Sequence, residues 1–118
     1  GLVLYRFNAP VIFYNANYFR RRVLEVVAAN PDADWLVVDG APIVRLDSTG
    51  ADTVASLAGE LRAVGVRLVI AGAHVRVAQT LECSAALESL GRDALFPTLR
   101  SAVEAHQERG SAAAEDRG

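Results

Sequence analysis

The chain has 118 residues, of which 52% are hydrophobic and 22% are charged, so it fits one globular domain and is too apolar for a disordered segment. A formal net charge of -2 argues against a nucleic-acid-binding protein, which usually presents a basic face. The single cysteine excludes an internal disulfide framework, and neither a signal-peptide pattern nor an apolar run of bilayer-spanning length is present.

The N-terminal third predicts two strands and a helix. Residues 2–7 (LVLYRF) are rich in β-branched and aromatic side chains, and an Asn-Ala-Pro turn separates them from a similar run at residues 11–14 (VIFY). We expect these two strands to form a hairpin. An asparagine cap at Asn15 or Asn17 then starts a helix, whose apolar residues recur at helical spacing up to Ala29.

The rest of the chain predicts alternating strands and helices. Residues 35–39 (WLVVD) and 66–71 (VRLVIA) each contain four consecutive apolar residues and predict strands covered on both faces. A helix that stops at Gly65 lies between them. The pattern then predicts a helix from Val75 that weakens around Ser84, a short strand near residues 94–96 and a last helix capped by Thr98.

The order of these elements predicts the fold class. A hairpin followed by βα units gives an α/β domain over residues 1–108, with a mixed sheet of about five strands, a parallel portion and about four helices. Residues 109–118 are small and polar, and we expect them to be a disordered tail. The sequence lacks methionine and starts within strand-like residues, so we expect it to be one domain of a longer protein.

An Asp-Ser-Thr-Gly turn, Asp47 to Gly50, stands between an apolar run and the second helix. Thr49 and Asp52 fit a capping box, and Ser48 or Asp47 could cap the helix instead, which would contribute about 1 kcal/mol. The same helix N-terminus could accept an anion, or carry a phosphate on Ser48 or Thr49 that Asp47 would repel. A nucleophilic serine would need a base, and neither histidine is placed beside Ser48, so no catalytic residue is expected.

Two further groups of residues could bind a ligand or partner. Asp39, Asp47 and His74 follow strands and so gather at the carboxyl edge of the sheet, where ligands of α/β proteins often bind. Asp39 and Asp47 could meet, but no third ligand for a metal is evident, and hydrogen bonding to loop amides is the simpler role for both. His74 is most simply a surface residue. A basic cluster on the first helix consists of Arg20, Arg21 and Arg22. This cluster could simply face solvent, or it could contact anionic lipid or an acidic partner surface.

Three segments in order resemble one known family. Residues 2–23 (LVLYRFNAPVIFYNANYFRRRV), 37–72 (containing VRLDSTGADTV) and 90–105 (LGRDALFPTLRSAVEA) are similar to the STAS domain of SulP-family sulfate permeases. The Asp-x-Thr-Gly turn is shared more loosely with bacterial anti-sigma-factor antagonists. The resemblance implies an α/β domain whose helices lie largely on one face of the sheet, and which follows a multi-span membrane domain.

The resemblance also implies a function. The chain would be a bacterial, non-enzymatic regulatory domain without a cofactor, on the cytoplasmic side of the membrane. It would contact its own transporter's membrane domain, a second protomer or another regulatory protein. In the antagonists a partner kinase phosphorylates a serine of this turn, and that position falls on Thr49, with Ser48 preceding it. Guanine or adenine nucleotide binding has been proposed for STAS domains, but this sequence has neither a Walker motif nor any lysine.

Overall fold

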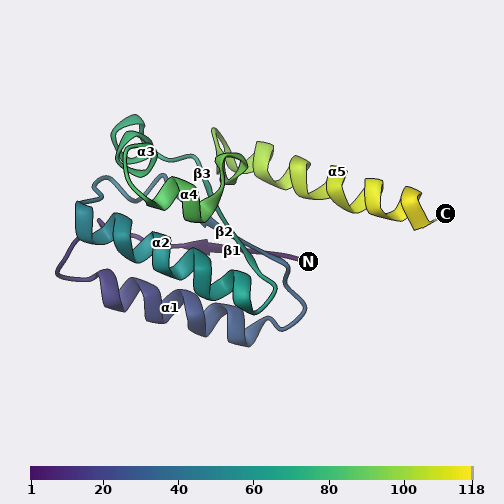
Figure 1. Cartoon of the computed structure of the whole chain (residues 1–118), viewed down its shortest axis with the longest axis horizontal. Helices are drawn as coiled ribbons and strands as arrows, with labels where there is room; N and C mark the ends of the chain where they lie inside the picture. Colours follow the sequence, from purple (N-terminus) through teal and green to yellow (C-terminus); the bar gives the residue numbers. More distant parts are fainter. Residues whose placement is uncertain (118) are drawn as a thin grey trace.

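A computed structural model describes residues 1–117, and the side chains of these except residues 92 and 110–117. Within this part of the chain, the centre is a parallel four-stranded sheet with the strand order β1-β2-β3-β4 (Figure 1). The strands are β1 (Leu2–Arg6), β2 (Trp35–Asp39), β3 (Arg67–Ala71) and β4 (Leu95–Phe96). Each strand lies beside the next one in the sequence, as expected for successive βα units.

The helices cover the two faces of the sheet unequally. They are α1 (Ala16–Ala29), α2 (Ser48–Ala63), α3 (Val75–Glu82), α4 (Ala86–Leu90) and α5 (Leu99–Arg117), with a 3-10 turn at Arg92–Ala94. The larger core cluster draws buried residues from α1 to α4, whereas only α5 contributes a helical residue, Ala102, to the buried part of the smaller cluster. Figure 1 shows α1 and α2 side by side on one side of the sheet, and α5 leading away from the body. The predicted α/β class, with helices mostly on one face, is confirmed.

The central strand β2 has apolar side chains on both faces of the sheet, so both faces must be packed against helices. All five of its residues are buried. Because side chains alternate along a strand, Leu36 and Val38 enter the larger cluster, whereas Trp35 and Val37 enter the smaller one. The apolar run WLVVD therefore has a buried environment on both faces of the sheet.

The predicted N-terminal hairpin is wrong. β1 pairs in parallel with β2, and Val11 makes only an isolated parallel bridge with Leu46. Asn15 closes a turn directly after this bridge, because its side chain accepts from the Ile12 N–H at 3.0 Å and donates to the Pro10 carbonyl at 2.7 Å. The run VIFY has strand-like residues, but this turn leads it into α1, and the sheet has four strands instead of about five.

The C-terminal region follows the predicted order. The expected weakening near Ser84 is a break between α3 and α4, where the Ser84 hydroxyl accepts from the Ala86 N–H at 3.2 Å. Thr98 caps α5 by accepting from the Ser101 N–H at 3.0 Å. α5 continues to Arg117. Residue 118 and the side chains from residue 110 onward lie outside the described part, and a disordered tail over residues 109–118 stays a prediction.

Within residues 1–117, no helix combines the length and the apolar character that crossing a bilayer requires.

Candidate functional site

The start of α2 is fixed by Asp47. One of its carboxylate oxygens accepts from the Gly50 N–H at 2.7 Å, and the other accepts from the Phe13 N–H at 2.9 Å. Asp47 is thus the N-cap, so the proposed capping box between Thr49 and Asp52 is wrong and the alternative cap at Asp47 is confirmed. Helical backbone already begins at Ser48, which puts Thr49 two residues past the cap position.

These hydrogen bonds also favour the charged form of the carboxylate. The Gly50 N–H holds the pKa of Asp47 below its ordinary value, against an opposing effect of partial desolvation. The Phe13 N–H and the positive charge of Arg45 lower the same pKa further. Asp47 therefore carries its negative charge at neutral pH.

Gly50 is required by packing. It is buried, and a Cβ at this position would overlap the carbonyl oxygen of Val11 and lie 2.8 Å from Leu46 Cδ1. The first turn of α2 can therefore lie against the Val11–Leu46 bridge only with a glycine here. Gly50 faces this contact, and its N–H is already used by Asp47.

Around this turn the chain exposes both polar and apolar side chains. Ser48 and Thr49 are exposed. Phe13 is 73% exposed, Tyr14 87% and Val44 65%, although large apolar side chains are usually buried. We call this surface the Asp47 rim, and it consists of Phe13, Tyr14, Val44, Asp47, Ser48 and Thr49.

The apolar part of the rim was missed by the sequence analysis. Phe13 and Tyr14 belong to the run that reads as a hairpin strand, where they would be core or cross-strand residues. The available signal was the close bracketing of VIFY by Pro10 and Asn15, since these residue types favour turns over strand interiors.

Asp39 and His74 both contact Ala41, in a separate loop at the carboxyl ends of the strands. Asp39 is buried and accepts from the Ala41 N–H at 3.0 Å, and the Nε2 atom of His74 lies 2.7 Å from the Ala41 carbonyl oxygen. Gly40 in this loop packs on Ala73, whose Cα would lie 2.8 Å from an added Cβ. Asp39 and Asp47 thus hydrogen-bond to backbone amides, as the simpler interpretation predicted. His74 is exposed, and its contact with Ala41 ties its own loop to this one.

The described residues contain no group of three side chains that could hold a metal ion. Asp39 bonds to Ala41 and Asp47 bonds elsewhere, so the structure does not bring them together as a ligand set. Binding of a nucleotide at this edge stays a prediction.

The three consecutive arginines of α1 have different surroundings. Arg20 makes a two-pronged ion pair with Glu60 of α2, at 2.9 and 2.7 Å, and Arg22 pairs with Glu25 at 2.6 Å. Arg21 lies over the Tyr18 ring, 5.6 Å from its centroid. Two of the three arginines therefore already form ion pairs with carboxylates of the protein. Contact of the cluster with lipid or an acidic partner stays a prediction.

Thr49 and Arg20, which are far apart in the sequence, line one hollow of 320 Å³ between α1 and α2. Asp52 and Glu60 line it as well. A phosphate on Thr49 would thus stand in a hollow that holds one guanidinium and two carboxylates.

The comparisons with known proteins agree on one family. A family model described as the STAS domain matches residues 1–102. A probable sulfate transporter of Mycobacterium tuberculosis is 36% identical over 110 residues, which cover 92% of this chain and 20% of that protein. Probable sulfate transporter 3.5 of Arabidopsis thaliana is 26% identical over 106 residues, which cover 89% of this chain and 17% of that protein.

Solved structures show the same fold. The STAS domain of a SulP transporter from Vibrio cholerae has a TM-score of 0.76 at 23% identity, covering 94% of this chain and 84% of that one. The murine anion transporter Solute Carrier 26 family member A9, in its inward-facing state, has a TM-score of 0.79 at 22% identity. The match covers 92% of this chain and 18% of that one.

The chain spans about a fifth of the length of the curated sulfate transporters it matches. The matched region of the family model contains the sheet strands, α1 to α4 and the whole Asp47 rim. The resemblance that the sequence suggested is confirmed, and the chain belongs to the STAS domain family.

Proposed function

We propose that this chain is the cytoplasmic regulatory domain of a SulP-type sulfate or anion transporter, and that it acts through protein contacts without catalysis. Its relatives of similar sequence are named sulfate transporters, and it corresponds to a small part of their length. The transported anion would pass through the membrane domain, whereas this domain would bind to that membrane domain and influence folding, assembly or transport.

The observation that carries the proposal is the exposed apolar surface of the Asp47 rim. Phe13, Tyr14 and Val44 stand in water, although burying each would be favourable. Exposed aromatic residues on a rigid support are typical of the residues that contribute most to protein interfaces. Asp47 supplies the rigidity, because it ties the Phe13 backbone to the start of α2. The rim therefore suits a protein partner, for which we propose the transporter's own membrane domain.

The test is a transport assay on the full-length protein, with and without this domain. If the domain regulates, its removal changes the transport rate or the amount of assembled protein in the membrane. Unchanged transport at equal membrane abundance would contradict the proposal. The reading frame upstream of Gly1 provides a cheaper check, since a transporter requires several apolar spans of about 20 residues there.

A phosphorylation switch is a second candidate function, favoured by the exposure of Ser48 and Thr49. A kinase needs the hydroxyl to be accessible, and both residues meet this condition. Phosphate would add about -1.5 to -2 charges beside Asp47. Incubation with cell extract and ATP, followed by mass spectrometry, tests this candidate, and unmodified Ser48 and Thr49 would speak against it.

A further inference from the structure

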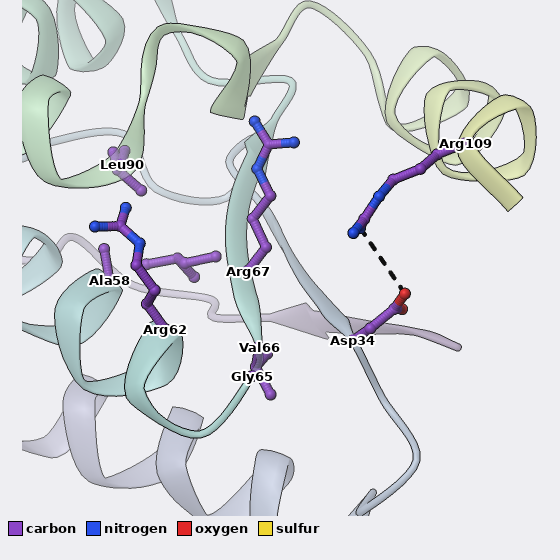
Figure 2. A pocket seen from close by; sticks show the side chains of 9 residues that line it. Asp34, Ala58, Arg62, Gly65, Val66, Arg67, Leu90 and Arg109 are labelled. Carbon is purple, nitrogen blue, oxygen red and sulfur yellow. Dashed lines mark ion pairs between the residues drawn. The ribbon is translucent and has the colours of Figure 1, made fainter. Parts of the chain in front are cut away.

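A cavity of 410 Å³ lies at the opposite end of the strands from the Asp47 rim. It is formed where α2 ends and β3 begins, with Leu90 of α4 and Arg109 of α5 on its walls. Figure 2 shows that three arginines line it from three different elements: Arg62 of α2, Arg67 of β3 and Arg109 of α5, with Arg67 between the other two in this view. Asp34 is the one carboxylate among the described residues on its wall.

The charges around this cavity are not balanced by the protein. Among the side chains that the structure describes, neither Arg62 nor Arg67 has a carboxylate within ion-pair distance. Arg109 lies 3.9 Å from Asp34, which also accepts a hydrogen bond from His106 at 2.8 Å if that ring nitrogen is protonated. Among the described residues that line the cavity, three guanidinium groups are thus accompanied by one carboxylate, in a chain whose net charge is -2. A generally basic surface does not explain this cluster.

Neighbouring groups hold the arginines in place. The Arg67 guanidinium lies 5.1 Å from the centroid of the buried Trp35 ring, and that of Arg109 lies 5.9 Å from it. Such cation–π contacts fix a guanidinium without neutralising it. Arg62 donates one N–H to the Ser89 carbonyl, which leaves other N–H groups of its five for a ligand. Part of the entropy cost of ordering these side chains is therefore already met before a ligand binds.

From this arrangement we propose that the arginine cavity, defined by Arg62, Arg67 and Arg109, binds a doubly charged oxyanion, a sulfate or phosphate group. Planar guanidinium forks match the oxygens of such groups in pairs. A cleft lined mainly by one sign of charge also raises the local concentration of the opposite ion. The volume of 410 Å³ lies within the range for small-molecule sites, so the oxyanion can be free or part of a small organic ligand.

The cavity is independent of the proposed role of the rim. It lies at the other end of the strands, and it shares no lining residue with the rim. Loss of oxyanion binding would therefore leave the rim proposal standing, and the converse also holds.

Calorimetric titration of this chain at constant ionic strength tests the proposal, with inorganic sulfate, inorganic phosphate, adenosine 5′-monophosphate and chloride as separate ligands. We expect saturable binding of oxyanions and no comparable binding of chloride. If the inorganic ions bind as tightly as the nucleotide, the site takes a free ion; if the nucleotide binds much more tightly, the site takes the oxyanion within an organic ligand.

Variants locate the binding. Arg62→Gln and Arg109→Gln should each raise the dissociation constant about tenfold or more, since each removes charged hydrogen bonds to the ligand. Arg76→Gln is the matched control, because it removes one exposed arginine from α3, away from the cavity, and should leave binding unchanged. Thermal unfolding shows which variants are folded, and either of the two cavity variants suffices for the test.

Two results would overturn the proposal. One is the lack of saturable binding of every oxyanion tested. The other is equal weakening by Arg76→Gln and the cavity variants, which would mean that the anions only screen the surface charge.

Discussion

The carboxylate of Asp47 accepts a hydrogen bond from the backbone N–H of Phe13, which lies 34 residues earlier in the chain, at 2.9 Å. The other oxygen of the same carboxylate caps α2 through Gly50. One side chain therefore sets the position of an exposed aromatic residue relative to the exposed hydroxyls of Ser48 and Thr49. The Asp-Ser-Thr-Gly turn thus positions residues on two elements.

Asp47→Ala should lower the thermal midpoint and increase amide hydrogen exchange at both Phe13 and Gly50. It removes the helix cap and the link to the preceding turn together. Asp52→Ala is the control, because Asp52 is exposed and does not cap the helix, so its effect should stay within about 0.5 kcal/mol. A larger loss from Asp52→Ala than from Asp47→Ala would restore the capping box.

The contribution of Asp47 to stability should depend on pH in the acid range. Its folded-state pKa is lowered, so the folded protein binds its proton less readily than the unfolded chain does. The stabilisation is therefore fully present above the unfolded pKa, about 3.9, and is lost as pH falls through the folded value below it. Denaturant midpoints of the wild type and Asp47→Asn, measured between pH 7 and pH 2.5, should converge on acidification. A constant difference over this range would contradict this account.

Two glycines of α2 should respond to alanine in opposite directions. Gly50→Ala should destabilise the domain by roughly 1–3 kcal/mol, because the new methyl group overlaps the Val11 carbonyl. Gly59→Ala meets no heavy atom within 4 Å and lies on an exposed part of the same helix, so it should stabilise by roughly 0.5–1 kcal/mol. Chemical denaturation measures both. Stabilisation by Gly50→Ala would show that the Val11 contact is not tight.

The parts of the fold that follow from local patterns could be predicted from the sequence. β2 has the predicted bounds because four consecutive apolar residues, Trp35 to Val38, and the Asp39 that follows them mark the strand and its end. α1 ends at Ala29, as its apolar stripe predicted. The VIFY run was misassigned because its own residues favour a strand. The contacts that decide its structure are the Asn15 side-chain bonds and a bridge to Leu46, and the latter is 35 residues away.

The candidate sites were predictable to different degrees. The Asp-Ser-Thr-Gly turn could be located because its residue types favour a helix start, but three residues were candidates for the cap. Asp47 is identified by its bond to the Gly50 N–H, and its second bond, to the distant Phe13 N–H, depends on the fold. The arginine cavity gave no sequence signal, since Arg62, Arg67 and Arg109 come from three elements and share no motif. Only the packing of α4 and α5 on the sheet brings them to one cavity.

The apolar part of the rim should contribute to function without contributing to folding. Val44→Ser removes an exposed apolar side chain of the rim, and Val64→Ser removes an equally exposed one at the far end of α2. Both should change stability by no more than about 0.5 kcal/mol. In the full-length protein, we expect Val44→Ser to alter transport and Val64→Ser to leave it unchanged. Equal transport by the two variants would argue against the rim as the contact surface.

Thr49→Glu should alter binding to the membrane domain while the fold stays intact. Thr49 is exposed in the first turn of α2, where a negative charge interacts favourably with the helix N-terminus. Asp47, Asp52 and Glu60 are nearby acidic groups, and Arg20 is the one guanidinium in the hollow that Thr49 lines. The added charge therefore changes the potential of the rim where a partner would dock, with little effect on packing.

Ser56→Glu is the matched control for this substitution. Ser56 is also exposed on α2 and lines the same hollow, but it lies about two turns farther along the helix from the rim. Ser56→Glu therefore adds the same charge to the hollow without placing it at the rim. Co-purification of the domain with the transporter from which it has been deleted measures binding, and thermal unfolding measures the fold. We expect Thr49→Glu to change the bound fraction and Ser56→Glu to behave as wild type. Wild-type binding by Thr49→Glu, or its unfolding, would remove the support for a switch at this turn.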